Sequence, residues 1–181
     1  MFIETEATPN PNTLKFLPGR AVMSSGTASY SAETAGHSPL ASRLFAVGGV
    51  SGVFFGHDFV TVSKEQDTDW AVLKPQLLAA IMDHYAGSEV PLEAAPPVAE
   101  EDGEEDPVVD KIRELLDLRI RPMVAGDGGD IIFCGYEDGI VYLEMHGACS
   151  GCPSASATLK HGVENMLRYY IPEVQAVEAV N

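Results

Sequence analysis

Cysteine is scarce in this sequence and unevenly placed. Three occur among 181 residues, Cys134, Cys149 and Cys152, so the first 133 residues contain none. An odd number of cysteines without a secretory signal favours free thiols in a reducing compartment over a disulfide framework. The amino terminus is acidic from its fourth residue, and no apolar run reaches the length of a signal peptide or a membrane span. We therefore expect a protein that is neither exported nor inserted in a membrane.

Basic residues are also few. Eleven Lys and Arg stand against 27 Asp and Glu, which gives a formal net charge of -16 at pH 7. A surface this acidic repels phosphate backbones and anionic lipid head groups at long range. Neither a nucleic acid nor a membrane is expected as a partner.

The composition is otherwise that of a folded protein, with 45% hydrophobic and 21% charged residues. The length suits two small domains, each able to bury a core of its own. Between them, residues 88–107 hold four prolines around an acidic run, which predicts a flexible linker extended by self-repulsion. We expect an α+β protein with domains at 1–87 and 108–181.

The first domain is predicted to contain strands and helices in alternation. Strands are expected at 2–6 and 13–17, followed by a Gly/Ser-rich loop, a helix that opens at Pro39, and a hairpin within 50–62. A longer helix begins near Asp69, a natural N-cap. No constellation of titratable groups is visible, so an interaction or regulatory module is expected. Four aromatic residues are expected in its core: Phe54, Phe55, Phe59 and Trp70.

The second domain is predicted to contain two helices and a hairpin. Its first helix starts near Pro107 and stops or kinks before Pro122. Strands at 131–135 and 140–145 pair through an Asp-Gly turn. A final helix runs from Pro153, and the tail after it can add an edge strand.

A C-x-x-C motif lies at the junction between the second hairpin strand and the last helix. It reads Gly-Ala-Cys-Ser-Gly-Cys-Pro at 147–153. A turn of two residues, one of them glycine, lets both thiols face one point, as chelation of a metal centre requires. Pro153 suits the first helical position, which places both sulfurs in the positive end of the helix dipole and favours thiolate. Cys149 and Cys152 are therefore the candidate metal ligands.

Two thiolates do not complete a structural zinc site or an iron–sulfur cube, since each takes four protein ligands. Cys134 lies in the middle of a strand, and we expect a packed, inert thiol there rather than a ligand. A two-fold axis near the motif supplies the same pair again. A symmetric dimer is therefore the simplest source of four sulfurs.

Several motifs, in one order, resemble the C-terminal domain of NifU and the Nfu iron–sulfur proteins. They are Ile-Arg-Pro at 120–122, Asp-Gly-Gly-Asp at 127–130, Gly-Tyr-Glu-Asp-Gly at 135–139, and the cysteine motif with Thr-Leu-Lys at 158–160. The first domain resembles the Nfu N-terminal domain through the segments at 8–16 and 49–55. The two resemblances together span nearly the whole chain.

The resemblance implies a non-enzymatic iron–sulfur scaffold or carrier. On the family pattern, Cys149 and Cys152 hold a labile [4Fe-4S] cluster between two subunits of a homodimer, and a [2Fe-2S] cluster is the alternative. The cluster passes to apo iron–sulfur client proteins, with other cluster-assembly proteins as further partners. Mitochondrial members carry a presequence, whereas this sequence begins directly at the first domain, so a bacterial cytoplasmic protein is expected. Exposure on a surface turn lets a competing thiol take the cluster.

Three other interpretations stay open. A mononuclear zinc site could add His146 and His161 to the cysteine pair, although zinc-finger spacings are absent. A C-x-x-C at a helix N-terminus could also exchange disulfides, although no βαβ unit is predicted before it. The chain could instead be an adaptor that brings clients to another cluster donor.

Overall fold

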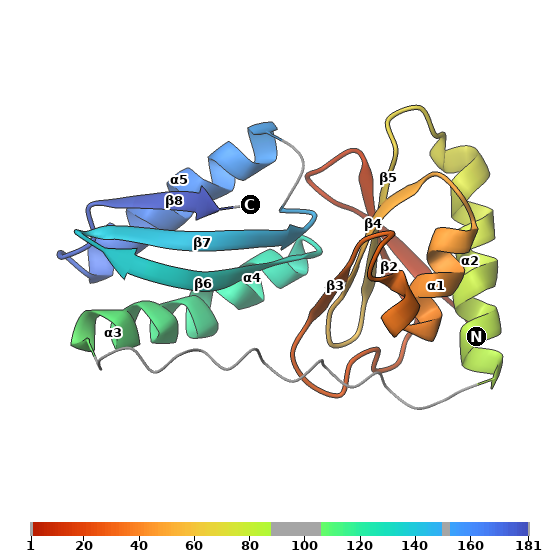
Figure 1. Ribbon diagram of the computed structural model, residues 1–181, viewed down its shortest axis with the longest axis horizontal. Coiled ribbons are helices and arrows are strands. Elements are labelled where there is room, and N and C mark those ends of the chain that lie inside the picture. Colours follow the sequence, from red (N-terminus) through yellow and green to blue (C-terminus); the bar gives the residue numbers. More distant parts are fainter. Residues whose placement is uncertain (1, 88–105, 150–152, 181) are drawn as a thin grey trace. The chain divides into compact units, whose positions relative to one another are not determined.

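The computed structural model describes residues 2–87, 106–149 and 153–180. It divides the chain into two compact units, Met1–Ala95 and Pro96–Asn181. Each unit combines a sheet with helices (Figure 1), which confirms the expected α+β class. Cys152 and the predicted linker up to residue 105 lie outside the described residues. Within the described part of the chain, no helix is both long and apolar enough to cross a membrane.

The first unit contains a five-stranded antiparallel sheet in the order β1-β2-β5-β4-β3. Its strands are β1 Glu4–Ala7, β2 Thr13–Leu17, β3 Ala28–Tyr30, β4 Val50–Phe55 and β5 Val60–Lys64. The helices are η1 Ala35–His37, α1 Pro39–Ala46 and α2 Trp70–Gly87. Strand β3 and the short helix η1 lie in the stretch that the sequence predicted as loop.

Helices α1 and α2 lie side by side and pack their apolar residues against the sheet (Figure 1). The Asp69 carboxylate accepts a hydrogen bond from the Ala71 amide at 2.9 Å, so the predicted N-cap of α2 is confirmed. Phe54, Phe55 and Phe59 are buried as expected. Trp70 is partly buried beside the same core. The aromatic residues of this unit therefore serve its packing.

The second unit contains a three-stranded sheet in the order β6-β7-β8. Its elements are α3 Pro107–Leu115, η2 Leu116–Ile120, α4 Arg121–Gly126, β6 Gly129–Glu137, β7 Ile140–Gly147, α5 Pro153–Tyr170 and β8 Ala176–Val180. Strands β6 and β7 form an antiparallel hairpin, whereas β8 pairs with β7 in parallel. Helix α5 is the crossover that a parallel pair requires. The cysteine motif thus lies at the first turn of a β7–α5–β8 unit.

As predicted, the α-helix that opens this unit is interrupted before Pro122, but the chain does not leave the helical path there. Proline lacks an N–H and crowds the carbonyl four residues earlier, so it breaks an ordinary α-helix. Here η2 is five residues of π-helix directly before α4, and Pro122 falls in the first turn of α4. The wider π turn gives the proline ring room. The chain therefore stays helical from Pro107 to Gly126.

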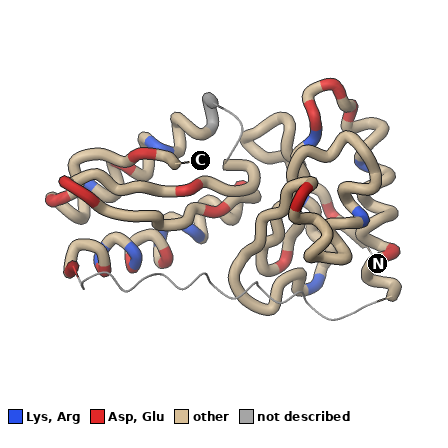
Figure 2. Tube along the Cα trace, viewed as in Figure 1, with Lys and Arg blue, Asp and Glu red and all other residues tan. Residues whose placement is uncertain are grey.

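The core of the second unit lies between its helices and one face of its sheet. Helix residues Ile112 and Leu167 are buried, as are Leu143 on β7 and Val177 on β8. The same buried cluster extends to Cys149 at the end of the sheet. Acidic residues are spread over both units, and most basic residues of the second unit lie on the helical stretch 107–126 (Figure 2). The candidate site therefore begins at one end of a packed core.

Candidate functional site

The Asp-Gly-Gly-Asp turn lies beside the cysteine motif at the end of the β6–β7 hairpin. Gly129 at the start of β6 is paired with Gly147 at the end of β7. The Ala148 amide donates a hydrogen bond to the Gly128 carbonyl at 3.1 Å. Gly128 has a φ of +80°, a conformation that glycine adopts without strain. The two turns are thus joined directly through their backbones.

Cys149 points into the unit rather than to solvent. Its side chain is 6% exposed and belongs to the buried apolar cluster. The Ser156 hydroxyl on α5 donates a hydrogen bond to the Cys149 carbonyl at 2.8 Å. Gly129 lies so close that a Cβ there would collide with the Cys149 Sγ and would sit 2.8 Å from the His146 carbonyl oxygen. This close approach is the reason that position 129 requires glycine. The backbone conformation there does not require it, because its φ is not positive.

The electrostatic surroundings of Cys149 differ from the expected ones. Burial raises the pKa of its thiol to about 12, and the nearby carboxylates of Asp127 and Asp130 act in the same direction. The expectation of a helix-dipole thiolate is therefore wrong for Cys149 in this conformation. Disulfide exchange and metal binding both need the thiolate, so the raised pKa of Cys149 by itself does not separate the two interpretations. Cys152 lies outside the described residues.

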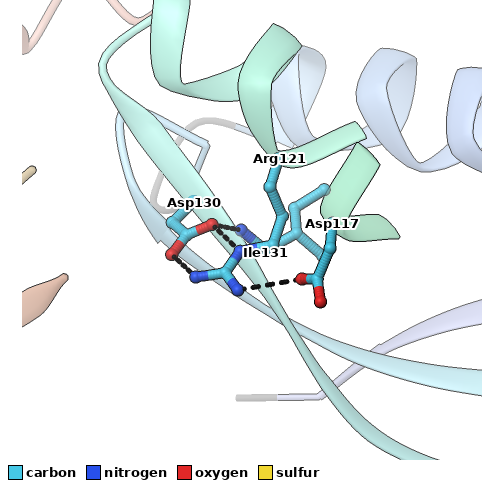
Figure 3. Close-up of polar contacts among 4 residues, drawn as sticks. All are labelled: Asp117, Arg121, Asp130 and Ile131. Carbon is cyan, nitrogen blue, oxygen red and sulfur yellow. Dashed lines mark hydrogen bonds and ion pairs between the residues drawn. The ribbon is translucent and has the colours of Figure 1, made fainter. Parts of the chain in front are cut away.

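An ion pair anchors the glycine turn to helix α4. Asp130, whose side chain is 4% exposed, accepts two hydrogen bonds from Arg121, Nε to Oδ1 and Nη2 to Oδ2, both at 2.9 Å (Figure 3). Oδ1 also accepts from the Ile131 amide at 2.8 Å. Arg121 Nη1 reaches the exposed Asp117 at 3.0 Å. These bonds, led by the one to Asp130, raise the pKa of Arg121, which stays cationic.

The remaining candidate ligands lie elsewhere. Cys134 is exposed rather than packed, and it sits at a bulge between Phe133 and Gly135. Five residues of strand, roughly 17 Å, separate Cys134 from Gly129, so its thiol cannot share a metal centre with Cys149. His146 contacts the Glu144 carboxylate at 3.1 Å.

His161 is exposed on helix α5, two turns beyond the start of that helix. Among the described residues, which exclude Cys152, no group of three or more His, Cys, Asp or Glu side chains could hold a metal ion. The described geometry therefore gives no support to a zinc site that includes either histidine.

Comparison with known proteins accounts for both units. A family model described as scaffold protein Nfu/NifU N terminal matches residues 3–88, and a NifU-like domain model matches residues 112–178. This chain belongs to the Nfu/NifU scaffold family. The resemblance predicted from the motifs is confirmed.

Relatives of this family member match it along its whole length. It is 53% identical over 184 residues, or 99% of the chain, to proteins of Drosophila persimilis and Drosophila erecta. Both are named NFU1 iron-sulfur cluster scaffold homolog, mitochondrial, and the chain spans 65% of the length of each. A solved NifU-like protein from Saccharomyces cerevisiae is 28% identical, with a TM-score of 0.47, over 54% of this chain and 86% of that one.

The expected bacterial cytoplasmic location is wrong, because the matched relatives are named as mitochondrial proteins of Drosophila. The expectation rested on how the sequence begins. Because this Nfu/NifU chain spans only 65% of the length of those relatives, its first residues carry no information about location.

Sequence reasoning missed the contacts among the residues around Cys149. The Ile-Arg-Pro and Asp-Gly-Gly-Asp motifs were used as separate marks of the family, but Arg121 and Asp130 are partners. Gly129 makes room for Cys149, which the motif alone does not indicate. The hairpin register could have signalled this proximity. Counting residue pairs from the Asp-Gly turn brings Gly129 to the end of β7, next to the cysteine motif.

Proposed function

We propose that this chain is an iron–sulfur cluster scaffold or carrier whose cargo is held by Cys149 and Cys152. The observation that carries the proposal is the placement of Cys149 at the exit of β7. The Ala148 amide before it donates to the Gly128 carbonyl, the Ser156 hydroxyl donates to the Cys149 carbonyl, and a side chain at position 129 would collide with the thiol. The names of the relatives support the same role. Residues 108–181 hold the cargo in this proposal, and residues 1–87 form the module that meets clients and assembly proteins.

Four sulfur ligands come from two copies of the chain. Cys134 is too far along β6 to join the motif, so each copy contributes the pair Cys149 and Cys152. A two-fold axis beside the motif then completes the ligand set of a cluster. The family pattern favours a [4Fe-4S] cluster over a [2Fe-2S] cluster.

Loading requires Cys149 to leave its sheltered position, because the residue is only 6% exposed in the described conformation. Iron binds thiolate, so each cysteine releases its proton as it binds. Transfer is the reverse exchange. A client thiolate replaces a carrier thiolate on iron, the carrier cysteine regains a proton, and the oxidation state of iron does not change. The role requires ligand exchange and no catalytic group.

Anaerobic reconstitution with iron and sulfide tests the ligand assignment. The wild-type chain should become brown with a broad charge-transfer absorption, and Cys149→Ser or Cys152→Ser should abolish that band. Cys134→Ser is the matched control, because Cys134 is exposed and lies far along β6 from the cysteine motif. The charge-transfer band should persist in this variant. A colourless wild-type sample would contradict the carrier role and favour the adaptor interpretation. Loss of the band in Cys134→Ser would overturn the ligand set.

Mass and iron content test the dimer. Loading should convert the chain to twice its mass with about four irons per two chains, if the cargo is a cube. About two irons per two chains and the matching Mössbauer spectrum would identify the two-iron cluster instead. A brown monomer contradicts the shared site.

A further inference from the structure

We propose that Arg121 is a positioning residue for Cys149, acting through its ion pair with Asp130 and the glycine turn between them. The inference rests on the proposed function only in taking Cys149 as a cargo ligand. Arg121 itself does not touch the thiol. Its guanidinium lies on helix α4 and reaches the first residues of β6 with two parallel hydrogen bonds (Figure 3).

The anchor of the glycine turn is an ion pair between helix α4 and strand β6. Arg121 and Asp130 form a bidentate pair, which fixes orientation as well as distance. Asp130 also accepts from the Ile131 amide, so its carboxylate is held from both the helix and its own strand. A buried carboxylate with a fixed partner has one geometry, and the backbone that carries it is fixed with it.

The turn before Asp130 is held through its backbone, because Gly128 and Gly129 have no side chains. The Gly128 amide donates to the Ala125 carbonyl at 3.0 Å, and the Gly128 carbonyl accepts from the Ala148 amide at 3.1 Å. Glycine leaves the backbone more freedom than any other residue. Asp130 is the next residue along the chain, and its side chain is the first after the two glycines that can be anchored. The Arg121–Asp130 pair therefore adds a side-chain restraint to a turn that is otherwise held by backbone hydrogen bonds.

The glycine turn contacts the cysteine directly. Gly129 lies against the Cys149 Sγ and the Cys149 amide. The Gly128 carbonyl accepts a hydrogen bond from the Ala148 amide, one residue before the cysteine. A displaced turn loses that bond and leaves a gap beside the thiol. Removal of the anchor should therefore release Cys149 from its sheltered position.

The chain offers a matched control on the same guanidinium. Asp117 accepts one hydrogen bond from Arg121 Nη1, but its side chain is 62% exposed and lies on the helix, away from the glycine turn. Asp117→Asn removes a negative charge that touches Arg121 and leaves the pair with Asp130 intact. A general effect of charge near Arg121 should appear in both Asp117→Asn and Arg121→Met. A positioning effect should appear in Arg121→Met alone.

Amide hydrogen exchange of the full cluster-free chain, resolved by NMR, measures the turn directly. In Arg121→Met, exchange at the Ala148 amide should accelerate at least tenfold. The Val177 amide, at the far edge of the sheet, should change much less, since it reports general stability of the unit. Asp117→Asn should leave Ala148 as in the wild type. Equal acceleration at both amides, or unchanged exchange at Ala148, overturns the proposal.

Thiol labelling gives an independent measure of the cysteine. In a Cys134→Ser, Cys152→Ser background, iodoacetamide should modify Cys149 at least fivefold faster when Arg121→Met is added. Loss of the guanidinium leaves Asp130 uncompensated beside the thiol, which disfavours thiolate and slows the reaction. A faster reaction therefore reports exposure and not charge. A slower or unchanged rate contradicts the release of Cys149.

Arg121→Lys completes the test and remains informative if Arg121→Met fails to fold. Lysine keeps the charge but cannot make two parallel bonds to one carboxylate. Exchange at Ala148 should therefore fall between the wild type and Arg121→Met, or above the wild type where Arg121→Met is unfolded. Wild-type exchange in Arg121→Lys contradicts the need for the bidentate geometry. These measurements use cluster-free protein, so a wild-type chain that fails to take up iron refutes the proposed function without deciding the role of Arg121.

Discussion

The close approach of Gly129 to Cys149 can be tested by adding a single methyl group. Gly129→Ala places a Cβ 2.8 Å from the His146 carbonyl oxygen and 3.0 Å from the Cys149 amide nitrogen, besides the collision with Sγ. Two of these three contacts are backbone atoms, which cannot move aside as the end of a flexible side chain can. Gly129 does not have a positive φ, so backbone strain is not a competing explanation.

The expected cost follows from overpacking. Forcing a methyl group into a filled site costs about 1–3 kcal/mol. At about 1.4 kcal/mol for each factor of ten, the folding equilibrium constant of the second unit should fall roughly 5- to 150-fold. Gly135→Ala is the matched control, because it lies on the same strand and an added Cβ there meets nothing within 4 Å. That variant should be neutral or more stable by up to about 1 kcal/mol.

Urea unfolding of the full chain, followed in each unit separately, measures the difference. Trp70 is the only tryptophan and lies in the first unit, so its fluorescence should give the same midpoint in all three proteins. Hydrogen exchange at the Leu143 amide on β7 reports the second unit. If Gly129→Ala and Gly135→Ala have the same stability, the explanation of the glycine as room for Cys149 is refuted.

Three further predictions concern other parts of the fold. Asp106→Ala removes the carboxylate that accepts from an amide of the first turn of α3 at 2.9 Å, so urea titration should show a loss of about 1 kcal/mol in the second unit. Gly139→Ala forces a φ of +80° on alanine and brings its Cβ to 2.9 Å from Gln175 Cγ, so the same titration should show a loss above about 1 kcal/mol. Burial and then the charge of Arg43 lower the pKa of His84 from 6.5, so folding favours its neutral form. The contribution of His84 to the unfolding free energy of the first unit should therefore be fully present above pH 6.5 and be lost as the pH falls below 6.5. His84→Gln should reduce this slope in fluorescence-monitored unfolding.

The elements predicted correctly are those whose signals are local. Helix α5 begins at a proline and carries its apolar residues at helical spacing, and both features are visible in a few turns of sequence. The β6–β7 hairpin has Asp138 at φ +51° and Gly139 at φ +80°, the conformations that an Asp-Gly turn adopts. In such cases the neighbours along the chain decide the structure.

The elements that were missed depend on distant partners. Strand β3 has three residues in a Gly/Ser-rich stretch, and it exists because Ala28–Tyr30 pairs with β4 residues 53–55. The helix through Pro122 depends on a π turn, which the sequence does not mark. Cys134 was expected to be packed because it lies in a strand, but it is exposed at a bulge. None of these features can be read from a window of neighbouring residues.

The candidate site divides in the same way. The C-x-x-C spacing identifies Cys149 from the sequence, but spacing does not show which way the thiol points. Its direction is set by Gly129, twenty positions earlier in the chain. The register counted from the hairpin turn places Gly129 opposite Ala148, and the bulge shifts the observed partner to Gly147. The bulge, which adds one residue to β6, therefore determines which residue near the end of β7 lies opposite Gly129.

A sheltered thiol is compatible with carrying a cargo that must be handed on. If Cys149 binds iron only when its turn is open, the apparent affinity for the cluster is the intrinsic affinity multiplied by the fraction of open chains. Every 1.4 kcal/mol of opening free energy thus weakens holding about tenfold. In the proposed carrier, Cys149 returns to its sheltered position when a client takes the cluster, and the free energy of that return favours release. In the proposed carrier, the contacts of Gly129 with Cys149 and the Arg121–Asp130 pair therefore set how firmly the cluster is held as well as where its ligand lies.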